Sequence, residues 1–352
     1  VSLVGGNATF ADKNVGAGKT VTLAGATLAG SDAGNYNLTS TTTTSATITA
    51  LGVTGSFTAD SKTYDGGSSA VVASRTVNGF VPSDDVSLVG GNATFADKNV
   101  GAGKTVTLAG ATLAGSDAGN YNLTSTTTTS ATITKKDASV TPTEAYKFYG
   151  ADDPTLTGVL DGFIAGDKVT ATYSRTGGET VANSPYLISA TLNAASDVLS
   201  NYYIDNKEAN FTITAQPLII TAYAGQKIYG TTPDPKLTYG FHGFVNGETE
   251  AVLSGGLKRA EGKNVGDYAI SSSFANTNYA IKFTPAVFKI TALGVTGSFT
   301  ADSKTYDGGS SAVVASRTVN GVISGDVVSL VGGNATFADK NVGAGKTVTL
   351  AG

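Results

Sequence analysis

The sequence contains no cysteine, no methionine and no tryptophan, and His242 is its only histidine among 352 residues. Without cysteine the chain cannot form disulfides, iron–sulfur clusters or thiolate zinc sites. A lone histidine leaves a His-based zinc site or a relay catalytic triad without its other parts. We therefore interpret His242 as a surface packing residue. The absence of cysteine also fits an exported chain, which must stay unfolded and unlinked in transit.

Charge is scarce as well, since charged residues make up 14% of the chain and the net charge is −4. No basic stripe is present, so nucleic acid is not an expected partner. No apolar run approaches the roughly 18 residues that would span a bilayer. Hydrophobic residues reach 40%, which is too high for general disorder. The dominant residues, glycine, threonine, serine, alanine and valine, are typical of a β-rich, turn-rich fold.

The chain consists largely of copies of itself. Residues 1–49 and 86–134 are identical, and residues 328–352 repeat the first half of that stretch. Residues 50–79 return unchanged as residues 292–321. Self-similarity of this kind indicates a tandem array of like modules, and it argues against a single site concentrated in one place.

Four short motifs recur in a constant order, and they divide the array into modules. They are a Tyr-Gly corner, a Gly followed by two apolar residues and then an acid, an Asn-Tyr pair, and an Ile-Thr pair. In the first whole module these are Lys62–Gly66, Gly79–Asp84, Asn120-Tyr121 and Ile133-Thr134. We predict a partial module at 1–49, whole modules at 50–134, 135–214 and 215–291, and a partial module at 292–352.

Within a module the apolar residues alternate with polar ones, as at Val53, Gly55 and Phe57, and Gly-rich turn clusters separate the short runs. This pattern, with no helical stretch of ten residues, predicts an antiparallel β-sandwich. After each Ile-Thr the next module begins within two to five residues, without a flexible linker. The predicted fold class is therefore all-β: a tandem array of small Ig-like antiparallel β-sandwich modules forming an extended rod. We expect the repeated tyrosines to be core anchors whose hydroxyls are satisfied at a strand corner.

The motifs resemble known repeat domains. Lys62-Thr63-Tyr64-Asp65-Gly66, followed by Asn-Val-Gly-x-Gly-Lys and Gly-x-Asp-Ala-Gly-Asn-Tyr, resembles the YDG repeat domain of large bacterial surface proteins. Residues 135–214 and 215–291, with Tyr-Gly followed by Asp-Pro, resemble the companion MBG repeat, although the former has Asn183-Ser184-Pro185-Tyr186 where Val-Gly-x-Tyr is usual. The resemblance implies the stalk of a filamentous, haemagglutinin-like adhesin, and it implies no catalytic residues.

Other motifs are better explained structurally. Gly16–Thr20 and its copies suggest a phosphate-binding loop, but the upstream glycine is missing and a strand-like run follows, so a Gly-rich hairpin turn is favoured. The acid pairs Asp84-Asp85 and Asp152-Asp153 lack the spaced ligands of a calcium loop, so turn-forming acids are favoured. The threonine-rich run 124–130, an alternative O-glycan acceptor, is interpreted as a β-rich loop entering the last strand. The Asn-x-Thr triplets match the N-glycosylation pattern only weakly.

We therefore expect a structural stalk or fibre segment of a secreted bacterial adhesin, a rigid spacer in cell-surface adhesion or biofilm. The alternative is that the modules themselves bind glycans or mucins weakly, with avidity across the array. No nucleophile, base and oxyanion donor can be assembled, so we do not expect an enzyme, a cofactor or a metal. The expected partners are neighbouring modules of the same chain, with host or matrix glycans and self-association into fibres as further candidates. The expected location is secreted, extracellular or on the bacterial cell surface.

Two further expectations concern the ends and the variable loop. Because residues 328–352 equal residues 1–25, we expect the array to cycle every 327 residues, as 328 minus 1, with Val1 preceded by a sequence close to Val322–Val327. Over residues 51–110 and 293–352 the two copies differ only between Phe80–Asp85 and Val322–Val327. We expect the apolar pair of this loop, Phe80-Val81, to cap the sandwich and touch the adjacent module.

Overall fold

The computed structural model describes residues 1–352 and is all-β, with 30 strands and six helical turns of three residues each. No helix is long and apolar enough to cross a membrane. The chain divides into two compact units. Unit 1 contains Val1–Ala145, Thr155–Thr176 and Tyr186–Phe211, and unit 2 contains Tyr146–Pro154, Gly177–Pro185 and Thr212–Gly352. The boundary between the two units passes through the module at 135–214. The contacts between this module and the preceding one therefore lie within unit 1, and its contacts with the following one lie within unit 2.

Unit 1 begins with residues 1–49, which form one three-stranded sheet of order β1-β2-β3. Its strands are β1 (Ser2–Phe10), β2 (Gly16–Ala29) and β3 (Thr44–Ile48). The whole module at 50–134 has two sheets, of order β10-β4-β7 and β5-β11-β9-β8-β6. Its strands are β4 (Leu51–Ala59), β5 (Lys62–Thr63), β6 (Ser69–Ala70), β7 (Val72–Asn78), β8 (Ser87–Phe95), β9 (Gly101–Ala114), β10 (Tyr121–Thr126) and β11 (Thr129–Thr134).

The two MBG-like modules repeat this two-sheet plan. In residues 135–214 the sheets have the orders β14-β12-β17 and β13-β18-β16-β15. The strands are β12 (Lys136–Pro142), β13 (Ala145–Phe148), β14 (Gly158–Asp161), β15 (Thr170–Arg175), β16 (Tyr186–Asn193), β17 (Tyr202–Asn206) and β18 (Ala209–Thr214). In residues 215–291 the orders are β21-β19-β24 and β20-β25-β23-β22. The strands are β19 (Gln216–Ala222), β20 (Gly225–Ile228), β21 (Tyr239–His242), β22 (Leu257–Arg259), β23 (Gly266–Ser272), β24 (Tyr279–Thr284) and β25 (Val287–Thr291).

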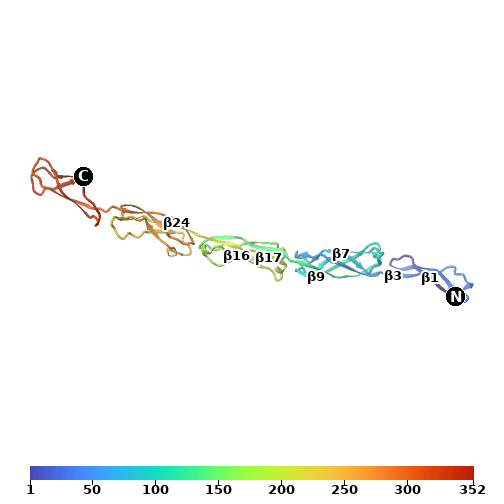
Figure 1. The fold of residues 1–352 in the computed structure, drawn as a ribbon. Helices are drawn as coiled ribbons and strands as arrows, with labels where there is room; N and C mark the ends of the chain where they lie inside the picture. The colour runs from blue at the N-terminus through green and yellow to red at the C-terminus, as the bar shows by residue number, and fades with distance from the viewer. The chain divides into compact units, whose positions relative to one another are not determined.

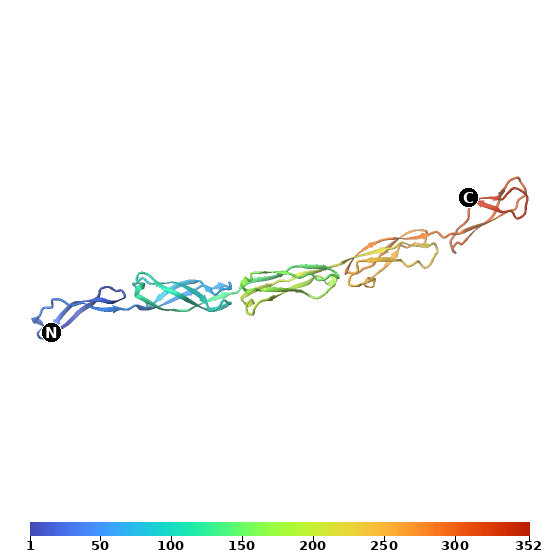
Figure 2. The same cartoon turned by 180° about the vertical axis from the view of Figure 1, so that it is seen from behind.

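Residues 292–352 form two smaller sheets, β26-β28 and β27-β29-β30. Their strands are β26 (Thr296–Ala301), β27 (Ser311–Ala312), β28 (Val314–Asn320), β29 (Asn334–Phe337) and β30 (Val348–Ala351). The helical turns are η1 (Ala33–Asn35), η2 (Ala118–Asn120), η3 (Ala165–Asp167), η4 (Val181–Asn183), η5 (Leu199–Asn201) and η6 (Glu250–Val252). Figure 1 shows β7 and β9 in one small body and β16 and β17 in another, and the view from behind in Figure 2 shows the same grouping. The prediction of an all-β array of small sandwiches is confirmed.

The sheets are mixed, which corrects the expectation of purely antiparallel sandwiches. The first long strand of each whole module runs parallel to the strand that begins at its Asn-Tyr pair: Leu51 lies opposite Tyr121, Lys136 opposite Tyr202, and Gln216 opposite Tyr279. The physical reason is that the chain enters each module at the end where the Asn-Tyr strand also begins. Parallel neighbours need a long crossover connection, and here most of the module supplies it.

The core follows the predicted two-residue period. Along β4, Val53, Gly55 and Phe57 are buried, while the residues between them are half-buried. On the facing sheet Val106 and Leu108 are buried. These side chains join one apolar cluster, as expected for a sandwich whose inner faces interdigitate.

Two identical sequences show what completes this core. Leu88 and Phe95 are 5% and 3% exposed in the whole module, but the matching Leu3 and Phe10 are 48% and 41% exposed. Residues 1–49 form only the sheet β1-β2-β3, whereas residues 86–134 pack against the sheet that contains β4 and β7. The same local sequence therefore adopts the same hairpin in both places, and burial depends on the other half of the module.

Candidate functional site

Consecutive modules are joined by almost no free chain. Strand β11 ends at Thr134 and β12 begins at Lys136, and β18 ends at Thr214 and β19 begins at Gln216. One residue thus separates the last strand of one module from the first strand of the next. The prediction that these strands follow each other directly is confirmed, and it brings the recurring motifs of neighbouring modules into contact.

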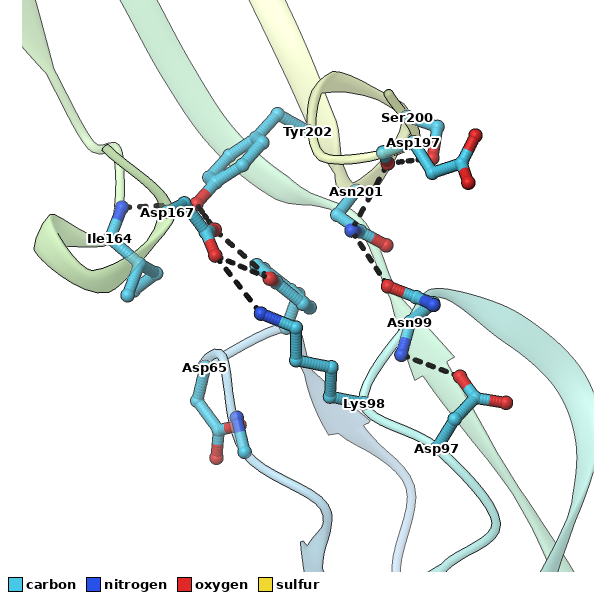
Figure 3. A network of polar contacts seen from close by, with 12 residues as sticks. Asp65, Asp97, Lys98, Asn99, Ile164, Asp167, Asp197, Ser200, Asn201 and Tyr202 are labelled. Carbon is cyan, nitrogen blue, oxygen red and sulfur yellow. Dashed lines mark hydrogen bonds and ion pairs between the residues drawn. The ribbon is translucent and has the colours of Figure 1, made fainter. Parts of the chain in front are cut away.

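A buried carboxylate lies at the centre of the joint between residues 50–134 and 135–214 (Figure 3). The Asp167 side chain is 1% exposed. From the preceding module, the Tyr64 hydroxyl donates to its two oxygens at 3.1 and 2.9 Å, and Lys98 Nζ lies 3.2 Å from Oδ1. From its own module, the Tyr202 hydroxyl donates to Oδ2. Three donors thus converge on one carboxylate, two of them from the neighbouring module.

The surroundings of this carboxylate shift the pKa values of the groups around it. Burial acts to raise the pKa of Asp167, but hydrogen bonds from Tyr202, Tyr64 and Lys98 outweigh burial and lower that pKa. Burial and the bond to Asp167 raise the pKa of Tyr202 to about 12. Both tyrosines therefore remain protonated donors and Asp167 remains an acceptor at neutral pH.

The same arrangement recurs where residues 135–214 meet residues 215–291. There the Tyr149 hydroxyl donates to Glu248 Oε1 at 2.6 Å across the joint, and the Tyr279 hydroxyl donates to Glu248 Oε2. The Tyr149 and Tyr279 rings pack edge to face with centroids 5.6 Å apart, as Tyr64 and Tyr202 do at 5.4 Å. Edge-to-face packing of this kind adds stability beyond area burial.

A second contact links the Asn of each Asn-Tyr pair to the preceding module. The Val100 backbone N–H donates to Asn201 Oδ1 at 2.8 Å. Asn201 Nδ2 donates to Asn99 Oδ1 at 3.2 Å (Figure 3). The corresponding bond from Val15 to Asn120 is 2.8 Å long, and the bond from Val181 to Asn278 is 3.0 Å long. Since the side chain of Asn201 is almost fully buried, losing this partner would leave a polar group unsatisfied.

The apolar pair in the acid loop packs on the glycine of the Tyr-Gly corner. A Cβ on Gly66 would lie 3.2 Å from Ile164 Cγ2, one on Gly150 would lie 2.3 Å from Val245 Cγ2, and one on Gly230 would lie 1.8 Å from Ile323 Cδ1. All three glycines have positive φ. Glycine is thus favoured at all three positions by backbone conformation, and at Gly150 and Gly230 also by the close approach. The loop thus contacts the adjacent module at these three joints, but the contact expected for Phe80-Val81 themselves stays a prediction, and Val81 is 45% exposed.

We name the two surfaces of the joint the socket and the plug. The socket is the Tyr-Gly corner together with the loop that donates the Val N–H, for example Tyr64–Gly66 with Lys98–Val100. The plug is the acid loop together with the Asn-Tyr pair, for example Ile164–Asp167 with Asn201-Tyr202. Each whole module carries a plug where the chain enters and a socket where it leaves.

The structure also places the other residues considered from the sequence. His242 is exposed at the end of β21. The Gly101–Thr105 motif opens strand β9 rather than a helix, and its Lys104 lies 2.6 Å from Asp97. In the threonine run, Thr124 and Thr126 lie in β10, and β11 begins at Thr129. Of the acids considered for calcium, Asp84 accepts from Tyr121 at 2.6 Å and from Lys13 at 2.8 Å, and Asp153 lies 2.7 Å from Lys147.

Five of the repeated tyrosines are core residues, as predicted, since Tyr64, Tyr121, Tyr149, Tyr202 and Tyr279 are buried, whereas Tyr229 is half-buried and Tyr36 and Tyr306, in the partial modules, are 66% and 57% exposed. Sequence reasoning missed that the hydroxyls of Tyr64 and Tyr149 are satisfied in the next module, by an acid about 100 positions away. It gave Asp167 and Glu248 no role beyond membership of a recurring motif. The available signal was that the Tyr-Gly corner, the acid loop and the Asn-Tyr pair recur together in every module.

Replacing Tyr64 by phenylalanine should weaken the joint, because Asp167 then loses one of its three donors. A hydrogen bond to a charged group contributes roughly 1.5–3 kcal/mol. Spin labels at Ser69→Cys and Thr172→Cys, both exposed sites on adjoining modules, would report a broader distance distribution. Tyr306 is the matched control, because it has the same local sequence, is 57% exposed and has no plug beside it. Tyr306→Phe should leave the distribution unchanged, and equal effects of the two variants would contradict the role given to Tyr64.

The joint should also open in acid. Because the pKa of Asp167 is lower in the folded joint than its usual value of 3.8, its contribution is fully present above about pH 4 and is lost as pH falls through the folded pKa. The same double-labelled chain should give a narrow distribution at pH 7 and pH 5, and a progressively broader one as the pH is lowered below about 4. If the β-sheet circular dichroism signal collapses before the distance distribution broadens, this expectation is contradicted.

The fold and the joint define an array of small β-sandwich modules coupled through one repeated contact. Residues 1–45, 47–130 and 290–352 match the YDG domain, and residues 138–212 and 218–289 match the MBG domain of YGX type. The chain belongs to the YDG domain family and carries two MBG domains, which confirms the resemblance drawn from its motifs. These domains fit the repeat modules of adhesin-like proteins. No curated protein is significantly similar to the chain.

Proposed function

We propose that the chain is a stalk or fibre segment of a secreted bacterial adhesin, and that it acts as a stiff spacer between the cell surface and a more distant binding region. The observation that carries this proposal is the joint. It combines a one-residue connection, a buried carboxylate held from both modules, and an Asn side chain that bonds the neighbouring backbone. A rigid connection needs several contacts that bending would break together, and this joint supplies them.

The chemistry of the conspicuous polar side chains supports a mechanical role over a catalytic one. Asp167 and Glu248 have their oxygens occupied by tyrosine hydroxyls of two modules. Lys104 and Lys147 are in ion pairs with acids of their own modules. A catalytic acid or base must be free to exchange a proton with a substrate, whereas these groups hold the structure together.

A spacer should be extended, and small-angle X-ray scattering on the 352-residue chain measures this directly. A compact globule of this length would have a radius of gyration of about 20 Å. We expect a value well above that, with a scattering profile typical of a thin rod. A radius close to the compact value would refute the spacer. The Asp205→Asn chain, which changes an exposed acid paired with Lys207 and not with any residue of the joint contacts above, serves as a control and should scatter like the parent.

The second candidate is that the modules themselves bind glycans. The observation that favours it is a pair of exposed aromatic side chains on strand β13 of the MBG domain at 135–214, namely Tyr146 and Phe148. Weak binding by each module would be amplified across the array. A glycan array probed with the whole chain and with a Tyr146→Ser, Phe148→Ser variant separates the two functions. Binding that disappears in the variant would favour glycan recognition, and no binding by either chain would favour the spacer.

A further inference from the structure

The chain contains every ordered pairing of its two domain types. The successive modules are YDG, YDG, MBG, MBG and YDG. Their four joints are therefore YDG to YDG, YDG to MBG, MBG to MBG and MBG to YDG. Residues 64–66 and 149–151 differ in sequence as Tyr-Asp-Gly and Tyr-Gly-Ala, so the joints can be compared across domain types within one molecule.

The contacts that the joints share do not depend on domain type. A socket tyrosine bonds the plug acid from YDG to MBG at Asp167 and from MBG to MBG at Glu248. From MBG to YDG, Tyr229 and Asp326 line the same pocket, and Asp326 raises the pKa of Tyr229. The Val N–H to Asn bond is present from YDG to YDG, from YDG to MBG and from MBG to MBG. In all three whole modules, the plug tyrosine lies opposite the first residue of the entering strand.

The contact that varies is the lysine, and its absence is tolerated. Lys13 and Lys98 of YDG sockets pair with the plug acid, at 2.8 and 3.2 Å. In the first MBG domain the equivalent position, two residues before Val181, is occupied by Glu179. Glu179 pairs with Lys147 of its own domain at 2.5 Å. The joint nevertheless forms there with both tyrosines on Glu248. The lysine is therefore an addition to the contacts that the socket tyrosine and the Val N–H make.

We propose that socket and plug are interchangeable, so that the socket of either domain type is a docking surface for the plug of either type. Module order is then not specified by the joints, and whole modules can be exchanged, lost or gained without disrupting them. This inference rests on the contacts alone and holds whether or not the array is an adhesin stalk. It concerns the plug of a YDG or MBG domain as the partner, and no other ligand.

The test is a reordered chain of identical composition, in which residues 215–291 precede residues 135–214. It creates three joints that the native chain lacks, and these should pair Tyr64 with Glu248, Tyr229 with Asp167 and Tyr149 with Asp326. Labels at Ser69→Cys and Lys282→Cys, both exposed, span the first new joint. We expect a distance distribution as narrow as that of Ser69→Cys and Thr172→Cys in the native chain.

Specific pairing is checked with Tyr64→Phe and Glu248→Gln. In the reordered chain the two substitutions should be non-additive in their effect on the distribution width, and in the native chain, where Tyr64 contacts Asp167 instead, they should be additive.

A second chain that lacks residues 135–214 creates the same first joint with only one new contact. A broad distribution in either chain with its β-sheet circular dichroism retained, or additivity in the reordered chain, would overturn the proposal. Loss of β-sheet signal in both chains would overturn it as well.

Discussion

Alanine in place of Asp167 should release the joint between residues 50–134 and 135–214 while both modules remain folded. The substitution leaves the Tyr64 and Tyr202 hydroxyls and Lys98 without the acceptor they share. Breaking a buried, charge-assisted network by removing one partner costs about 3–5 kcal/mol. The cost falls on the joint, because Tyr64 and Lys98 belong to one module and Asp167 to the next.

Spin labels at Ser69→Cys and Thr172→Cys measure this release, and the absence of native cysteine keeps the labelling specific. We expect a narrow distance distribution for the parent and a broad one for Asp167→Ala. Asp205→Asn removes the same charge at an exposed position 3.7 Å from Lys207, and it should leave the distribution narrow. An unchanged distribution in Asp167→Ala, or broadening of equal size in Asp205→Asn, would show that the carboxylate does not hold the joint.

Phe95→Ala should destabilise the module at 50–134 by about 3–5 kcal/mol, as truncation of a buried phenylalanine generally does. Phe10→Ala changes the same residue in an identical stretch of sequence, but Phe10 is 41% exposed where Phe95 is 3% exposed. Its expected effect on the module at 50–134 is within about 0.5 kcal/mol. The pair isolates tertiary burial from every local sequence effect.

The measurement is the labelling rate of a single thiol at Val106→Cys, a fully buried position in the same core. Labelling requires the module to open, so the rate reports its local stability. Phe95→Ala should raise the rate by roughly 100- to 4,000-fold, since each 1.4 kcal/mol corresponds to a factor of ten, while Phe10→Ala should leave it nearly unchanged. Similar rates in the two variants would contradict the burial-based explanation.

Much of the fold could be predicted because its signals are local and repeated. The alternation at Val53, Gly55 and Phe57 identifies a strand with one buried face, and the four recurring motifs place the module boundaries. The parallel pairing of Lys136 with Tyr202 could not be predicted in this way, since it joins residues 66 positions apart across a whole module. Periodicity within a strand gives its faces but not the direction of its neighbour.

The contacts between modules at the joint could not be predicted, for a related reason. Tyr64, Lys98, Asp167 and Tyr202 each have a satisfactory explanation inside their own module, as a core anchor, a loop cation, a turn acid and a second anchor. Nothing in the spacing of these residues indicates that a tyrosine of one module and an acid of the next share a hydrogen bond, because that depends on how the modules dock. The motifs recur as a group in every module, but this recurrence does not show that motifs of neighbouring modules are in contact.

The parallel pairing at the module entrance determines how a module would resist being pulled by its two ends. Strand β12 receives the pull where the chain enters, and it lies parallel to β17 from Lys136 opposite Tyr202 to Val140 opposite Asn206. A force along β12 is roughly perpendicular to the hydrogen bonds between β12 and β17. It therefore does not pull these bonds apart one at a time. The bonds of this ladder are loaded simultaneously, in shear, and must rupture together. The module is thus arranged to extend only after a collective failure of its first strand.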